Sequence, residues 1–231
     1  MIRALLWDND GVLVDTEPLY FRATRDCLAE IGVELTREHF GDLSLRQGRS
    51  CFDLAAGRGL AAAELEDLRR RRNHRYAELL RLGVDPMPGV RECLERLHGT
   101  RPMAIVTSSN PDHFALAHAR TGLAGFFELV LTNADYTHTK PHPEPYLTAA
   151  ARLGVEPASC LVIEDSERGL RAARAAGMRC AVLPGDLGAS GDFADADAVL
   201  ASVREVPELI ARLSRADAAL EAGGPWRPRS S

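Results

Sequence analysis

The sequence predicts an α/β protein, built as a doubly wound parallel sheet with an inserted all-helical domain. Two observations predict this class: short apolar runs that end at polar residues recur along the chain, and helix-like segments separate them. A third observation predicts the insert, because this alternation stops between residues 16 and 85. With 45% hydrophobic and 26% charged residues, the chain has the balance of a folded globular protein and not of a disordered or fibrous one.

Six short apolar runs, each ended by polar residues, predict buried strands. They cover residues 3–7, 102–107, 128–132, 160–164, 179–183 and 197–200. Helix-like segments accompany them at 89–98, 111–121, 143–152, 167–176 and 204–221. Because strands and helices take turns along the chain, we expect the strands to be parallel and both faces of the sheet to carry helices.

The stretch from Thr16 to Asp85 holds no convincing strand and is typical of helices. These are predicted at 17–31, 37–43, 50–56 and 61–82. Leucines at helical spacing mark the last of them, and Gly83 follows its end. We predict a helical cap domain at 16–85, which we call the cap, a core domain made of 1–15 and 86–215, and a disordered tail at 222–231.

Composition excludes several classes of protein. A formal net charge of -5 without a lysine-rich run argues against nucleic acid as a partner. The five cysteines are widely spaced and lack a CxxC pair, which argues against disulfides and a zinc site. The chain shows neither a signal peptide nor a run apolar enough to span a membrane, so we expect a cytoplasmic protein. We expect a monomer, because no coiled-coil heptad or long apolar stripe is present.

Polar residues follow four of the predicted strands. Three clusters stand at the ends of their strands, and the third cluster along the chain, Lys140, lies eight residues past its strand. They are Asp8 and Asp10, then Thr107, Ser108 and Ser109, then Lys140, then Glu164 and Asp165. Ligands of open parallel sheets bind where the carboxyl ends of the strands meet, so we expect these clusters to converge on one crevice. Each cluster also has an ordinary structural interpretation, as a turn, a helix N-cap or a solvated loop.

The chemistry that these residue types share is phosphoryl transfer. Two aspartates one residue apart repel each other unless a cation or a proton lies between them. With Asp165 and Glu164 they form an all-oxygen set of the kind that Mg²⁺ prefers. Lys140 would bring a positive charge to an anionic substrate, and Thr107 a hydroxyl donor.

The single lysine of the chain is a further indication. Among 28 basic residues only Lys140 is not arginine. If any cation would serve at this position, a chain so rich in arginine would be expected to use arginine there. A compact ammonium fits a tight site of carboxylates and phosphate that a planar guanidinium would overfill. The bias therefore predicts that Lys140 is functional rather than a solvated loop residue.

Four segments carry a family resemblance. DNDGVLVDTE at 8–17, VTSS at 106–109, KPHPEPY at 140–146 and VIEDSERG at 162–169 resemble, in order and spacing, the four signature motifs of the haloacid dehalogenase-like hydrolases. The string DGVLVDTEP and the position of the helical insert resemble the β-phosphoglucomutase-like branch of that superfamily. The resemblance covers residues 1–215 and, as a set of four motifs, is highly specific.

The resemblance implies a role for each motif residue. Asp8 would be the nucleophile that forms an aspartyl-phosphate, and Asp10 the general acid and base. Mg²⁺ would be held by Asp8, the backbone carbonyl of Asp10 and Asp165, with Glu164 close by. The phosphate-binding residues would be Thr107 and Lys140, with the backbone N–H groups beside Asn9 and Ser108.

The cap residues are predicted to select the substrate. Arg46 and Arg49 lie in the loop LRQGRS, where family members place such residues, although plain surface arginines are an equally open interpretation. Arg72 precedes Asn73 where the β-phosphoglucomutase pattern resembles Lys-Asn. Thr16 and Tyr20 complete the tentative set. The histidines show no metal-ligand spacing and are expected to be non-catalytic; they include His74, His113, His118, His138 and His142.

The predicted function is a Mg²⁺-dependent phosphatase acting on a small phosphorylated metabolite, foremost a sugar phosphate. A sugar phosphomutase is the alternative, disfavoured because Tyr20 stands where β-phosphoglucomutases have a histidine. A catalytically silent binding protein is a third possibility, disfavoured because the motif residues are intact. The insert lacks the lysine that a phosphonatase Schiff base needs, and Asp10 argues against a dehalogenase.

Overall fold

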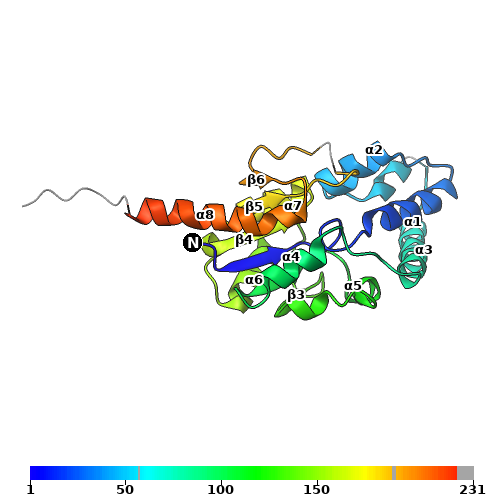
Figure 1. The fold of residues 1–231 in the computed structure, drawn as a ribbon. Coiled ribbons are helices and arrows are strands. Elements are labelled where there is room, and N and C mark those ends of the chain that lie inside the picture. The colour runs from blue at the N-terminus through cyan, green and yellow to red at the C-terminus, as the bar shows by residue number, and fades with distance from the viewer. Residues whose placement is uncertain (57, 189–190, 223–231) are drawn as a thin grey trace, which may run out of the picture.

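The core is a parallel sheet covered by helices on both faces (Figure 1). The computed structural model describes residues 1–56, 58–188 and 191–222. Its strands are β1 (Ala4–Trp7), β2 (Met103–Val106), β3 (Leu129–Leu131), β4 (Cys160–Glu164), β5 (Arg179–Val182) and β6 (Ala198–Val199). They are ordered β3-β2-β1-β4-β5-β6, and each neighbouring pair is parallel. The predicted doubly wound sheet is confirmed.

Alternate residues of each strand bury against opposite helical layers, as the two-residue period of a strand requires. Leu5 and Trp7 of β1 pack with α4 (Val90–Leu97), α5 (Pro111–His118) and α8 (Val206–Ala222). Leu6 packs on the other side with α6 (Glu144–Leu153) and α7 (Glu167–Ala175). Because both faces are buried, the strands are continuous apolar runs, and β1, β2 and β4 are buried at every position.

The cap is helical and has an apolar cluster of its own. It contains α1 (Glu17–Ala29), α2 (Arg37–Phe40), the π-helical η1 (Gly41–Arg46), the 3₁₀ η2 (Cys51–Ala55) and α3 (Ala62–Arg81). Buried side chains such as Phe21, Phe40 and Phe52 form its interior, which Leu187 of the core joins. In Figure 1 these helices lie together at one end of the molecule, beyond the carboxyl ends of the strands. The cap therefore covers the sheet edge at which the motif residues were predicted to meet.

Several predicted boundaries are wrong by a few residues, because local turns end the helices early. The predicted helix 37–43 passes into a π-helical turn after Phe40, and the predicted helix 50–56 is a 3₁₀ helix. Short 3₁₀ turns also occur at η3 (Ala124–Phe126), η4 (Pro157–Ser159) and η5 (Val203–Glu205), the last directly before α8. Residue 222, predicted to begin a disordered tail, is the last residue of α8, and 223–231 lie outside the described residues.

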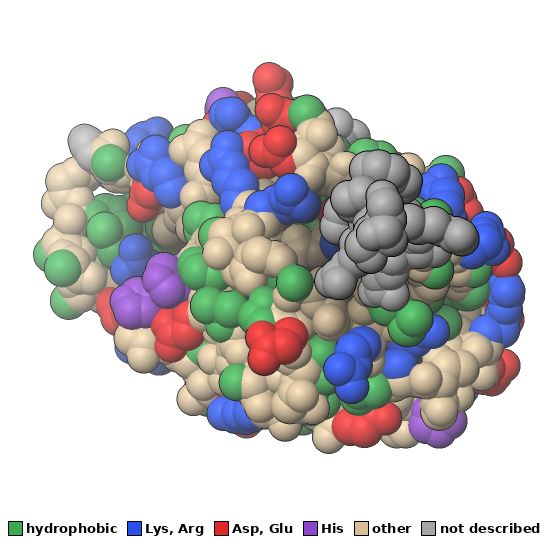
Figure 2. Space-filling model, turned by 90° about the vertical axis from the view of Figure 1, so that its left-hand side faces the viewer, with side chains coloured by type: hydrophobic (Ala, Val, Ile, Leu, Met, Phe, Trp, Pro, Cys, Tyr) green, Lys and Arg blue, Asp and Glu red, His purple; other side chains and the backbone are tan. Residues whose placement is uncertain are grey.

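The end of the core that faces away from the cap carries a mixed surface. Over the described residues of that face, basic and acidic side chains are interspersed among apolar ones (Figure 2). None of the helices in the described part of the chain combines the length and apolarity needed to cross a bilayer.

Candidate active site

The predicted clusters meet at the carboxyl edge of the three central strands. Asp8 follows β1, Thr107 follows β2 and Asp165 follows β4, and β1 lies between the other two strands. Between this edge and the cap is a cavity of about 440 Å³. Its walls include Asp8, Asp10, Thr16, Glu17, Tyr20, Ser44, Gly48, Arg49, Arg72, Asn73, Tyr76, Ser108, Ser109, His113, Asp165 and Arg168. Residues far apart in the sequence therefore share one crevice, as expected.

A tight turn after β1 brings the first motif to this edge. The backbone N–H groups of Val12, Leu13 and Val14 all point at the carbonyl of Asn9, at 2.8 to 3.4 Å. Gly11 has φ of 79°, and a Cβ atom at this position would overlap the Asp165 carboxylate. Only glycine satisfies both the left-handed conformation and the close approach. The turn thus fixes the first motif against the last.

Lys140 lies behind Asp8 and not in the open cavity. Its Nζ atom donates to Asp8 Oδ1 at 2.6 Å, to Glu164 Oε1 at 2.6 Å and to the carbonyl of Val106 at 3.0 Å. The side chain is 1% exposed. Burial alone would lower its pKa, but the charges of Asp8 and Glu164 outweigh burial and raise the pKa. Lys140 therefore stays charged, and all three of its hydrogens have acceptors.

Glu164 is the main partner of Lys140. Its Oε1 atom accepts from Lys140 and from the hydroxyl of Tyr146 at 2.7 Å. Its Oε2 atom accepts from the backbone N–H groups of Asp165 and Ser166 and from the Ser166 hydroxyl at 2.8 Å. Burial would raise the pKa of Glu164, but Lys140 and these donors lower it to about 2. Both oxygens, which were predicted to contribute to a metal site, are already occupied by protein donors.

Three further carboxyl groups crowd the cavity beside this pair. Oxygens of Asp8, Glu164 and Asp165 lie within 4.8 Å of one another. Burial, opposed by Lys140, raises the pKa of Asp8 to about 7, and burial together with Glu17 raises the pKa of Asp165. Burial and Asp10 raise the pKa of Glu17 to about 7. Lys140 and Arg168 offset only part of the negative charge of this crowded set of oxygen donors, which fits a hard divalent cation such as Mg²⁺.

Asp10 is held by three hydroxyl groups. Its Oδ1 atom accepts from Thr16 at 2.6 Å, and its Oδ2 atom accepts from Thr107 at 2.9 Å and Ser109 at 3.0 Å. Thr16, predicted to bind substrate, thus contacts Asp10, and the hydroxyl of Thr107, predicted to bind phosphate, is engaged with the same carboxylate. Hydroxyl groups can donate or accept, so this arrangement tolerates both protonation states of Asp10.

The predicted phosphate-binding residues Asn9 and Ser108 lie on either side of this carboxylate. The Oγ atom of Ser108 is buried, lines the cavity and has no partner among the described residues. Asn9 is fully buried, and its Oδ1 atom lies 2.7 Å from His118 Nε2. Burial lowers the pKa of His118 to about 4, so the ring is neutral and donates to Asn9 from Nε2. His118 is therefore a positioning residue that the sequence did not reveal.

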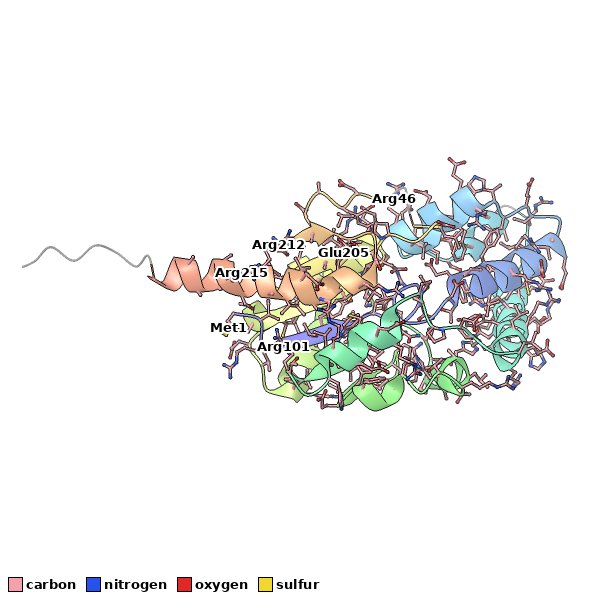
Figure 3. The ribbon with its side chains drawn as sticks, viewed as in Figure 1. Met1, Arg46, Arg101, Glu205, Arg212 and Arg215 are labelled. Atoms are coloured by element: carbon pink, nitrogen blue, oxygen red, sulfur yellow. The ribbon has the colours of Figure 1, made fainter. Side chains whose placement is uncertain are left out.

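The cap arginines differ from one another in their surroundings. Arg72 lines the cavity and stacks on Tyr20, with its guanidinium carbon 4.4 Å from the ring centre. Arg49 also lines the cavity but pairs with Asp53 at 2.9 Å. Arg46 is absent from the cavity wall; it pairs with Asp42 and lies on the upper side of the cap in Figure 3. The structure thus separates three arginines that the sequence treated alike.

Two histidines without metal-ligand spacing come together in space. His138 and His142 lie with Glu144 on the loop that carries Lys140, and their ligand atoms are within 4.8 Å of one another. Glu144 accepts from the backbone N–H groups of Thr137 at 2.8 Å and His138 at 2.9 Å. Glu144, the half-buried first residue of α6, therefore holds the turn of the loop before it, and the two histidines beside it are exposed.

Comparison with known proteins gives the same family as the motifs. A family model described as haloacid dehalogenase-like hydrolase matches residues 2–177. The chain belongs to the haloacid dehalogenase-like hydrolases. It is 33% identical to the fructose-1-phosphate phosphatase YqaB of Escherichia coli, over 75% of this chain and 92% of that protein. It is 31% identical to hexitol phosphatase B of the same species, over 89% of this chain and 94% of that protein.

Solved structures of this superfamily share the fold. A mutant of CbbY from Rhodobacter sphaeroides in complex with xylulose-(1,5)bisphosphate has a TM-score of 0.75 and 28% identity, covering 89% of this chain and 96% of that one. A β-phosphoglucomutase from Clostridium difficile has a TM-score of 0.75 at 22% identity, covering 89% of this chain and 93% of that one. The second likeness concerns the fold alone.

Sequence reasoning left out three residues of the site. Glu17 ends the first motif but was given no role, and Tyr146 ends the third motif in the same way. Arg168, inside the fourth motif, lines the cavity. All three residues lie inside one of the four motifs, and this position could have marked them as candidates. Which atoms they face could not be inferred, because those partners come from other parts of the chain.

Proposed function

We propose that this hydrolase is a Mg²⁺-dependent phosphatase, which cleaves the phosphate ester of a small sugar phosphate through an aspartyl-phosphate on Asp8. The observation that carries the proposal is the placement of Asp8. It lies in the cavity wall, Lys140 holds one of its oxygens, and Asp10 lines the same cavity. The relatives named for fructose 1-phosphate and hexitol phosphatase activity support a sugar phosphate as substrate.

Asp8 supplies the nucleophile. Its Oδ1 atom is fixed by Lys140, while Oδ2 accepts no hydrogen bond from the described residues. In the first step an oxygen of Asp8 forms a bond to phosphorus, and the bond from phosphorus to the sugar oxygen breaks in line with it. Lys140, which is buried and whose pKa is raised by Asp8 and Glu164, would orient the attacking carboxylate and then donate to the carbonyl oxygen of the acyl-phosphate.

Asp10 transfers the protons in both steps. It gives a proton to the departing sugar oxygen, and then takes one from the water that attacks phosphorus and releases Asp8. Thr16, Thr107 and Ser109 can reverse the direction of their hydroxyl groups as Asp10 changes its charge. The free hydroxyl of Ser108 and the backbone beside Asn9 would hold the phosphoryl oxygens.

Mg²⁺ fits the carboxylates beside Asp8. Asp8 and Asp165 would hold it, with the backbone carbonyl of Asp10 and with Glu17 close by, and the bound ion would offset negative charge on the transferring group. Glu164 would support the site by fixing Lys140, since both its oxygens are engaged. The cap at 16–85 would exclude water and select the substrate over a core of 1–15 and 86–215, in a cytoplasmic monomer.

Hydrolysis of an aryl phosphate tests the proposal. We expect turnover with Mg²⁺, little turnover after the ion is removed with EDTA, and a loss of about 10³-fold or more in Asp8→Asn. Arg152→Lys, a substitution at an exposed position of α6, serves as the control. An inert wild-type protein, or an Asp8→Asn variant with full activity, would overturn the assignment of the nucleophile.

The products of a panel of sugar phosphates distinguish a phosphatase from a mutase. We expect free phosphate and the dephosphorylated sugar in equal amounts. An isomeric sugar phosphate formed without free phosphate would show that the phosphoryl group returns to a second hydroxyl, and would overturn the hydrolytic part of the proposal.

A further inference from the structure

Arg168 is a cavity-lining cation in the field of the buried carboxyl groups of Glu164, Asp8 and Asp165, which raise its pKa against the effect of burial. It follows the first residue of α7, and among the residues that the structure describes it forms neither an ion pair nor a side-chain hydrogen bond. Its Nε atom is fully buried. The other arginines of α7 differ from it, because Arg171 pairs with Glu167, and Arg174 lies 3.3 Å from Asp197. A buried donor that lacks an acceptor costs free energy, so a site of this kind is complete only when a ligand supplies one.

Arg168 lies where the core and the cap meet. A Cβ atom placed on Gly48 of the cap would lie 3.6 Å from Arg168 Cδ and 3.5 Å from the carbonyl oxygen of Lys140. Gly48 has φ of 68°, so its loop turns tightly over the arginine. Arg49, next in this loop, lines the cavity as well. Arg168 therefore lies in the cavity wall where the Gly48 loop of the cap meets the core.

The scissile phosphate has a separate set of binding groups. Ser108, with its unpartnered hydroxyl, lines the cavity together with Asp8, while Lys140 holds Asp8 from behind and has acceptors for all three of its hydrogens. On the cap side Arg72 is a second cation without an acidic partner among the described residues, since it contacts Asn73, Thr24 and the ring of Tyr20. A monophosphate bound at Asp8 would leave Arg72 without an acidic partner and the Nε–H of Arg168 without an acceptor among the described residues.

We propose that Arg168 binds a second anionic group of the substrate, so that the preferred substrate is a sugar or polyol with two anionic groups. This inference rests on the proposed phosphatase activity. The guanidinium would form a paired hydrogen bond with a phosphate or carboxylate at the far end of the substrate, and the buried Nε–H would gain its missing acceptor. Arg168 is then a specificity residue contributed by the core, opposite Arg72 of the cap.

Steady-state kinetics with matched substrates test this subsite. Wild-type protein, Arg168→Gln and Arg168→Lys are compared on fructose 1-phosphate, fructose 1,6-bisphosphate and 6-phosphogluconate, with an aryl phosphate as the minimal substrate. We expect Arg168→Gln to raise the KM of the substrate with two anionic groups about tenfold or more, with kcat changed less than about threefold. The bisphosphate and the phosphorylated acid distinguish a second phosphate from a carboxylate. Fructose 1-phosphate and the aryl phosphate should lose less than about threefold in kcat/KM.

Arg171→Gln, on the same helix, is the matched control, because its guanidinium is exposed and already paired. An equal loss on all substrates would overturn the inference, since Arg168 would then serve the phosphoryl group or the fold. No loss on any substrate would also overturn it. If Arg168→Gln does not fold, Arg168→Lys decides, because a retained charge without the paired geometry should still raise KM only for substrates with two anionic groups. A wild-type protein inert on every phosphate would instead contradict the proposed function.

Discussion

The two walls of the cavity are built differently. The core wall is backed by Lys140 and Glu164, which lie behind Asp8, are 1% and 0% exposed, and each have several hydrogen-bond partners. On the cap wall, Arg49 is 56% exposed and has one acidic partner, and Arg72 is held by stacking and two weak contacts. In the proposed function, the groups that hold the reacting atom are placed by buried strand ends, whereas the groups proposed to choose a substrate lie on a loop and on α3 of the cap.

This contrast follows from how each wall is supported. The core residues follow β1, β2 and β4, whose backbones are fixed by parallel neighbours on both sides. The cap residues come from the π-helical turn at 41–46, the loop at 47–50 that follows it and the middle of α3. Substitutions on the core wall should therefore cost both activity and stability, and substitutions on the cap wall should mainly change KM.

Asp10→Asn should have the largest effect on activity. It leaves acceptors and donors for the three hydroxyls but cannot exchange a proton, so we expect kcat on a sugar phosphate to fall about 10²- to 10⁴-fold. The melting temperature should stay close to that of the wild type. A kcat within tenfold of the wild type would remove Asp10 from proton transfer.

Lys140→Met should destabilise the core most strongly. It leaves Asp8 and Glu164 buried without their shared cation, and we expect a loss of about 3–5 kcal/mol in the free energy of unfolding, measured with urea. Lys140→Arg keeps the charge but not the compact shape, and should lower kcat about 100-fold or more. Full activity in Lys140→Arg would show that the single lysine of the chain is accidental.

His118 should make the core sensitive to acid. Its pKa is about 4 in the folded chain, below the value near 6.5 in the unfolded chain, so between these values the unfolded state binds more protons and stability falls as the pH falls. We expect His118 to contribute a loss of about 2 kcal/mol between pH 7 and pH 5. Urea unfolding of the wild type and His118→Gln at both pH values measures it. An unchanged pH dependence in the variant would contradict the neutral, buried ring.

Arg72→Ala and Arg46→Ala should show the smallest effects and should differ from each other. Arg72 lines the cavity, and its removal should raise KM about tenfold, equivalent to about 1.4 kcal/mol, with kcat nearly unchanged. Arg46 is paired with Asp42 outside the cavity wall, and its removal should change KM less than about twofold. Equal effects of the two substitutions would contradict the finding that Arg72 lines the cavity and Arg46 does not.

Much of the fold could be predicted because it depends on local patterns. The six strands are short apolar runs, of which β1, β2 and β4 are buried at every position, and polar residues follow the ends of these runs, as at Asp8 and Asp165. The cap boundaries between helices were less predictable. Hydrophobic spacing does not distinguish an α-helix from the π-helical and 3₁₀ turns at 41–46 and 51–55, because these differ by hydrogen bonds and not by residue type.

The candidate site was predictable in membership but not in contacts. Asp8, Asp10, Lys140 and Asp165 share one edge of the sheet, as their positions after strands predicted. The sequence did not reveal that both carboxylate oxygens of Glu164 accept hydrogen bonds from protein donors, or that a neutral His118 orients Asn9. These are contacts between residues 20 to more than 100 positions apart or between groups whose direction depends on packing.

The sequence by itself determined the order of strands and helices, the four motifs and the unusual single lysine. It could do so because the hydrophobic period of a strand or helix, and the chemistry of a motif, depend on residues that are close together in the sequence. Only the tertiary structure decided which donors are matched: Lys140 by two carboxylates, Arg46 by Asp42, and the Nε–H of Arg168 by no acceptor of a described residue. Pairing depends on distances of a few ångströms between distant segments, and folding sets those distances.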